Sequence, residues 1–287
     1  MLFEDETFTH TNVAIWILTS AAASFLFVRL YCRFRYSHVW WDDFVLTISW
    51  LILLVAGALM SSAITAGSNT DEGKRAFFLF HHTSTSMTTI ATSWTKVAFA
   101  VTLLRIVQHR TMTYLLWAII VTANMILVLG ILSIWIPACG DPATEWRPAR
   151  SMCWSVGTLQ YLGGTTIVYG GVIDILLALC PWFVIRKVLL QTREKIGLAV
   201  AMSLGAVTGI IVIFRAFFQF IDTTNRYHFM VFMSIFNFME PAITIIAQTI
   251  PMFRVLLSHA KWDSQRDIHL DSVVGPHLEL TVTKSGV

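Results

Sequence analysis

The stretch FVLTISWLILLVAGALMSSAITA, residues 44–66, is long, apolar and free of charged side chains. An α-helix rises about 1.5 Å per residue, so about 20 apolar residues cross the roughly 30 Å hydrocarbon core of a bilayer. A helix also satisfies its own backbone hydrogen bonds, as any membrane-spanning segment must. This stretch therefore predicts a transmembrane helix.

Comparable apolar runs fill most of the chain. Charged residues make up only 13% of it, against about 25% in an ordinary soluble domain. Seven runs lie near residues 13–31, 44–66, 80–106, 113–136, 159–185, 196–221 and 229–257, the third and fifth being weakened by Ser, Thr and Gly. We predict an all-α integral membrane bundle of seven transmembrane helices over residues 13–257, with the lipid bilayer of the plasma membrane or an endomembrane as its surroundings.

The basic residues predict the orientation of this bundle, because cytosolic loops near helix ends are enriched in Lys and Arg. With the N-terminus outside, 13 of the 20 Lys and Arg residues fall on the cytosolic side. We therefore expect residues 1–12 to form an extracellular tail and residues 258–287 a cytosolic tail. The total charge of +3 gives no support to nucleic-acid binding.

Two cysteines, Cys139 and Cys153, lie in the loop that this orientation places on the oxidising side. The segment between them contains Pro142 and Pro148 and no apolar core, so a disulfide would help to order it. Two free thiols are the alternative. The other two cysteines, Cys32 and Cys180, fall near the predicted cytosolic helix ends, and we expect them to stay reduced.

Four ionisable residues fall inside the predicted spans, where charges are costly and usually face the bundle interior. They are Lys96, Asp174, Arg215 and Glu240. Their estimated depths pair Lys96 with Asp174 and Arg215 with Glu240. These pairs either pin helices together or contact a polar group of a ligand. All four are candidate ligand-binding residues, and Asp174 and Glu240 are also candidate catalytic acids.

The third predicted span is unusually polar, since nine of the thirteen residues from Thr83 to Thr95 are Ser or Thr. Thr85, Thr89 and Thr92 share one helical face with Lys96. Such a stripe either makes hydrogen bonds between helices or lines a polar cavity. Glycines allow helices to approach closely in the fifth and sixth spans, at Gly163, Gly164, Gly170, Gly171, Gly205 and Gly209.

Asp42 and Asp43 precede the second span. They are expected either to cap its helix or to form an ion pair with Arg29 and Arg33 on the cytosolic side.

Several motifs occur in an order that resembles one family. The segment RLYCRFRYSHVWWDDFVLTISW (29–50) contains R-x-x-x-R followed by WDD, and TKVAFAVTLLRI (95–106) has a central Lys and a terminal Arg. This pattern resembles the fungal rhodopsin-domain membrane proteins, also called the satratoxin-cluster type. Further matching positions are Cys139, Trp146, Cys153, Asp174, Pro181, Lys195, Gly205, Arg215, Glu240, Pro251 and Arg254.

The resemblance implies a seven-helix protein grouped with receptor-like fungal surface sensors, many relatives of which belong to secondary-metabolite gene clusters. A G protein or pathway enzymes are the partners it implies. The chain departs from some sensors in lacking a cysteine-rich extracellular module and in having a short cytosolic tail. A retinal pigment is not expected, because the seventh run contains no Lys for a Schiff base.

Two functions follow as hypotheses. The first is a receptor-like protein that binds a small lipophilic ligand. The second is a membrane-embedded enzyme or accessory protein of a secondary-metabolite pathway, in which an intramembrane carboxylic acid transfers protons. A transporter is disfavoured because no internal repeat is evident. The sequence contains no HExxH motif, phosphate-binding glycine loop or serine-nucleophile elbow, so we expect no cofactor and no metal.

Overall fold

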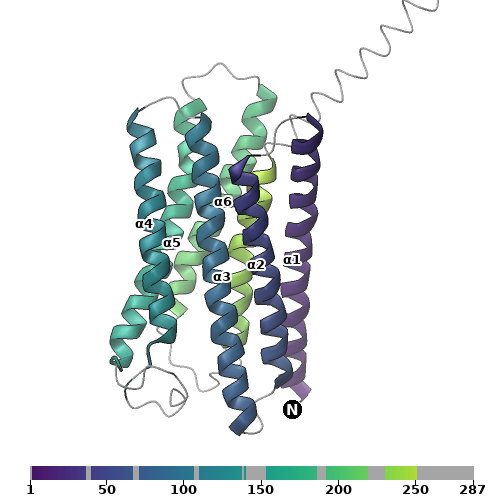
Figure 1. Cartoon of the computed structure of the whole chain (residues 1–287), viewed down its shortest axis with the longest axis vertical. Coiled ribbons are helices and arrows are strands. Elements are labelled where there is room, and N and C mark those ends of the chain that lie inside the picture. The colour runs from purple at the N-terminus through teal and green to yellow at the C-terminus, as the bar shows by residue number, and fades with distance from the viewer. Residues whose placement is uncertain are drawn as a thin grey trace, which may run out of the picture.

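The computed structural model describes residues 2–36, 40–66, 71–106, 110–137, 139, 153–185, 192–218 and 230–250. These residues form seven helices, which run up and down side by side in one bundle (Figure 1). The helices are α1 (Leu2–Tyr36), α2 (Trp41–Ala66), α3 (Asp71–Ile106), α4 (Arg110–Trp135), α5 (Val156–Ile185), α6 (Thr192–Phe218) and a last helix (Met230–Ile250).

Six of these helices are long and apolar enough to cross a membrane, and α3 is the exception. Large apolar side chains also cover the outside of the bundle, for example Ile17, Phe27, Trp117, Met125 and Phe214. A soluble protein rarely leaves so much apolar surface in contact with water. The chain is therefore a multi-pass membrane protein.

The polarity of α3 is explained by its place in the bundle. It packs against α2, α4 and α5, and it contributes buried residues to all three apolar clusters of the core. Most hydroxyls of its Ser- and Thr-rich segment donate to carbonyls of α3 itself, as Thr85 and Thr89 do. Ser84 instead donates to Ala56 of α2, and Ser93 to Ala123 of α4. The hydrogen bonds between helices thus come from Ser84 and Ser93, whereas Thr85 and Thr89 of the predicted stripe bond within α3.

The first helix differs from the prediction at its start. It begins at Leu2, whereas the apolar run begins near residue 13. The reason is local, since residues 2–36 contain neither Gly nor Pro to end a helix. At the other end of the chain, the last helix continues through Pro241, and the predicted segment 251–257 and the tail 258–287 lie outside the described residues.

Close packing of α5 on α6 depends on two facing glycines. A Cβ atom added to Gly209 would lie 2.7 Å from the carbonyl oxygen of Gly171, and one added to Gly171 would lie 2.7 Å from that of Gly209. Gly205 similarly approaches Ala178, at 3.2 Å. The predicted role of these three glycines is confirmed, and they bring the two helices together beside Asp174.

Candidate functional site

The centre of the bundle contains a buried ion network of three residues, which we call the lysine network: Lys96 of α3, Asp174 of α5 and Glu240 of the last helix. Lys96 Nζ lies 2.7 Å from Glu240 Oε1 and 3.2 Å from Asp174 Oδ1. It also donates to the carbonyl oxygen of Gly170 at 2.9 Å. One ammonium group therefore joins three helices.

This geometry confirms the pair of Lys96 with Asp174 and corrects the predicted pair of Arg215 with Glu240. Glu240 is paired directly with Lys96, and no direct ion pair within the described residues joins it to Arg215, although the charge of Arg215 still interacts with Glu240. The depth estimates compared positions along the membrane normal but contained no information on which helices are neighbours. Because α3 is central, Lys96 lies between both acids.

The backbone of α5 makes room for the ammonium group at Gly170. A Cβ atom there would lie 3.3 Å from Lys96 Nζ and 4.0 Å from Glu240 Oε1. A side chain at this position would crowd the ammonium group, and the bond to the Gly170 carbonyl would be harder to form.

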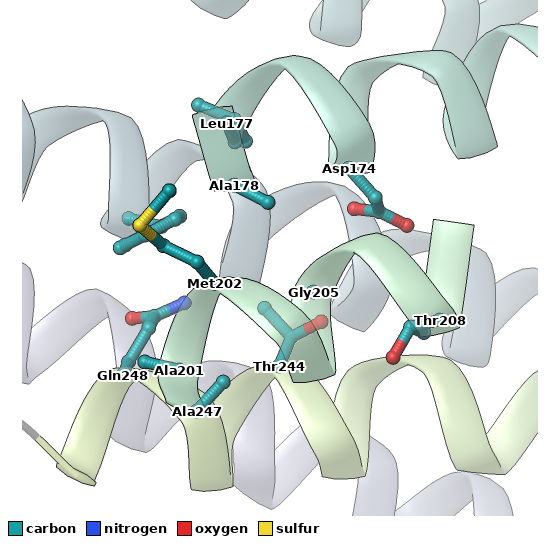
Figure 2. Close-up of a pocket in the computed structure, with 11 residues that line it drawn as sticks. Asp174, Leu177, Ala178, Ala201, Met202, Gly205, Thr208, Thr244, Ala247 and Gln248 are labelled. Carbon is teal, nitrogen blue, oxygen red and sulfur yellow. The ribbon is translucent and has the colours of Figure 1, made fainter. Parts of the chain in front are cut away.

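A pocket lies next to the lysine network, between α5, α6, the last helix and Phe99 of α3 (Figure 2). Figure 2 shows Asp174 extending from α5 toward α6, with Gln248 at the opposite side of the view. Asp174 is the candidate residue that lines this pocket; Lys96, Arg215 and Glu240 are not among its lining residues. The remaining lining residues are Leu177, Ala178, Ala201, Met202, Gly205, Thr208, Thr244 and Ala247.

A second group of buried charges lies where α1 and α2 meet, and we call it the arginine–aspartate cluster: Arg29, Arg33, Asp42 and Asp43. Arg29 Nε lies 2.9 Å from Asp43 Oδ1, and Arg29 Nη2 lies 3.0 Å from Asp42 Oδ2. Arg33 is 3.3 Å from each aspartate. The cluster is charge-balanced, and the predicted ion pairs are confirmed.

The same cluster holds further helices in place. Arg29 Nη1 donates to the carbonyl oxygen of Gln248 in the last helix at 2.8 Å, and Thr102 of α3 donates to Asp42 Oδ2 at 3.1 Å. The backbone N–H of Trp40 donates to Asp43 Oδ2 at 3.4 Å. Asp43 thus also caps the start of α2, as the alternative interpretation predicted.

The loop between α4 and α5 contains a disulfide between Cys139 and Cys153, which confirms that prediction. The bridge is accompanied by two backbone hydrogen bonds, from Cys139 N to Trp154 O and from Trp154 N to Pro137 O. Cys32 and Cys180 are free and buried. Trp146, one of the positions that match the family pattern, lies outside the described residues.

Sequence reasoning missed Gln248, Thr208 and Thr244 as pocket residues. Gln248 is buried, and its Nε2 donates to the carbonyl oxygen of Thr95 at 2.9 Å. The signal for Gln248 in the sequence was a polar amide side chain within the apolar run 229–257. The two threonines gave no signal, because the same residue type packs against lipid or helix elsewhere in the chain.

The comparison with protein families agrees with the resemblance. The model of the fungal rhodopsin domain matches residues 28–259, a range that contains the lysine network, the pocket, the arginine–aspartate cluster and the disulfide. A search of curated proteins finds no match. A match over most of the chain shows the family, and the chain belongs to the fungal rhodopsin domain family.

Proposed function

We propose that this protein is a receptor-like membrane protein that binds a small lipophilic ligand in the pocket between α5, α6 and the last helix. The observation that carries the proposal is the combination of mainly apolar walls with one buried carboxylate, Asp174. Small-molecule sites in proteins are typically apolar clefts with a few polar groups that orient the ligand. Sites between helices of a bundle are a common form of this arrangement.

The proposal includes seven membrane spans, with α3 as the third, over residues 13–257. With 36 residues, α3 is long enough to cross the membrane, and neighbouring helices pack against it. We place residues 1–12 outside and residues 258–287 in the cytosol. This orientation is supported by Figure 1, in which α1 begins at the end of the bundle where α4 ends and α5 begins, the two helices that flank Cys139 and Cys153. An epitope tag inserted between residues 186 and 195 should be inaccessible to antibody in intact cells, and labelling without permeabilisation would reverse the orientation.

Two variants in which an alanine is replaced by leucine test whether the pocket binds the ligand. Ala247→Leu adds volume inside the pocket, whereas Ala118→Leu adds the same volume on the exposed side of α4. Lipophilic compounds that raise the melting temperature of the wild-type protein in nanodiscs should lose this effect in Ala247→Leu and keep it in Ala118→Leu. Equal loss or equal retention in both variants would contradict the pocket as the site.

A second candidate function rests on the free carboxylate oxygen of Asp174 at the pocket wall. A membrane-embedded enzyme or accessory protein of a metabolite pathway could use it to transfer a proton. Metabolite profiling of a deletion strain separates the two functions. Accumulation of a pathway intermediate supports the enzyme and pathway partners, and an unchanged profile supports the receptor with a G protein as its partner.

A further inference from the structure

The polar groups that face the pocket share one property, which is that they accept hydrogen bonds. The hydroxyl of Thr208 donates to Leu204 O at 2.7 Å, and the hydroxyl of Thr244 donates to Glu240 O at 2.8 Å. A hydroxyl has one proton, so both oxygens retain only accepting capacity. A ligand group that meets them must therefore be a donor.

Two stronger acceptors complete this lining. Asp174 Oδ2 and Gln248 Oε1 are buried, and no donor among the described residues bonds to either atom. The orientation of the Gln248 amide follows from its bond to Thr95 O, because the opposite orientation would place two oxygens against each other. Buried polar atoms normally have a hydrogen-bond partner, so these two call for a donor.

The lysine network cannot supply that donor. An ammonium group has three protons, and those of Lys96 are matched by three acceptors: Gly170 O, Asp174 Oδ1 and Glu240 Oε1. In its direct ion pairs the network combines one formal positive charge with two negative charges, and the charge of Arg215 acts on Glu240 without forming a direct ion pair among the described residues. Within the described residues, Asp174 Oδ2 thus lacks a hydrogen-bond donor.

We propose that the ligand is a lipophilic amine, whose protonated nitrogen donates to Asp174 Oδ2 and whose apolar body contacts Phe99, Leu177 and Met202. This inference rests on the proposed function and names its ligand class. A neutral alcohol of the same shape offers the hydrogen bond without the charge. Both probes would donate to the same carboxylate, but only the ammonium adds the Coulomb attraction of an ion pair, so the amine should bind about tenfold more tightly than the alcohol.

The test compares octylamine with 1-octanol on the full chain in nanodiscs of neutral lipid, with melting temperature and a dissociation constant as readouts. In the wild-type protein the amine should bind about tenfold more tightly than the alcohol. Asp174→Asn, which keeps the shape of the side chain and removes its charge, should abolish this preference. Ala118→Leu is the matched control and should retain it, which excludes an effect of partition into the lipid.

Failure of the inference and failure of the proposed function give different results. If octanol and octylamine bind equally, and Ala247→Leu abolishes both, the pocket binds lipophilic molecules and the amine assignment is overturned. If neither probe binds, and no member of a wider set of neutral lipophilic compounds does, both proposals are overturned. The wild-type ratio alone decides the amine assignment even where Asp174→Asn fails to fold.

Discussion

The arginine–aspartate cluster and the lysine network are both buried groups of ion pairs, but they differ in their balance of positive and negative charges. The cluster has two cations and two acids, and Arg29 and Asp43 are almost completely buried within it. The network has one cation and two acids in direct ion pairs, with Arg215 acting on Glu240 from beyond ion-pair distance, and its oxygen without a donor among the described residues, Asp174 Oδ2, belongs to a residue that lines a pocket. Charge in low dielectric is costly unless it is paired and hydrogen-bonded. The balanced group is therefore suited to hold helices together, and the unbalanced group is suited to receive a ligand.

The two groups are also connected through one residue of the last helix. The carbonyl oxygen of Gln248 accepts from Arg29, while its side chain donates to Thr95 O and lines the pocket. Thr95 directly precedes Lys96 in α3. The arginine–aspartate cluster thus bonds directly to a residue that lines the pocket.

The largest expected loss of stability comes from removing a cation from the arginine–aspartate cluster. Among the described residues, Arg29→Met leaves Asp42 and Asp43 with Arg33 as their ion-pair partner, so it should lower the free energy of unfolding by about 3–5 kcal/mol. Chemical unfolding in detergent measures this change. Arg29→Met combined with Asp43→Leu restores the charge balance and should recover part of the stability. Strictly additive losses would show that the two residues do not interact.

Removal of the cation from the lysine network should have an effect of similar size. Lys96→Met strands two buried carboxylates and should cost about 3–5 kcal/mol. Adding either Asp174→Leu or Glu240→Leu leaves one acid stranded, so only the triple variant should approach wild-type stability in the same unfolding assay. Complete recovery of stability in the Lys96→Met, Asp174→Leu double variant would indicate a simple pair of Lys96 with Asp174. That result would contradict the three-residue network.

A glycine substitution should damage the pocket and spare the cluster. In Gly209→Ala the new Cβ atom meets Gly171 O at 2.7 Å and Asp174 Cβ at 3.3 Å, so α6 must shift, at a cost of about 1–3 kcal/mol. Gly157→Ala is the control, because a Cβ atom there has no neighbour within 4 Å. Melting temperature in detergent should fall for Gly209→Ala alone. Equal melting temperatures for the two variants would show that close approach of α5 and α6 is unimportant.

The smallest effect is expected at Arg215. It makes no direct ion pair with Glu240 among the described residues, and its charge acts on that acid from beyond ion-pair distance, so Arg215→Gln should lower the free energy of unfolding by clearly less than Lys96→Gln does. Comparable losses in the two variants, measured side by side, would support the pair of Arg215 with Glu240 that the depth estimate predicted.

Composition and run length predicted the helices well because the bilayer sets the length of a span. The disulfide was predictable because its two cysteines share one short loop, and the ion pairs of Arg29 because they join neighbouring helices. The partner of Glu240 was not predictable, since it depends on which distant helices touch. The pocket was also missed, because the apolar residues Ala201, Met202 and Ala247 do not differ in type from residues that face lipid.

The most direct test of the contrast is to replace one aspartate in each group by asparagine. Asn at position 43 would present N–H groups to two arginines and should cost about 3–5 kcal/mol, as expected when a buried ion pair is broken. At position 174 the same change leaves Lys96 balanced by Glu240 and turns a side-chain amide toward the pocket acceptors. We expect Asp174→Asn to unfold in detergent within about 1 kcal/mol of wild type. A loss at Asp174 as large as that at Asp43 would contradict the account.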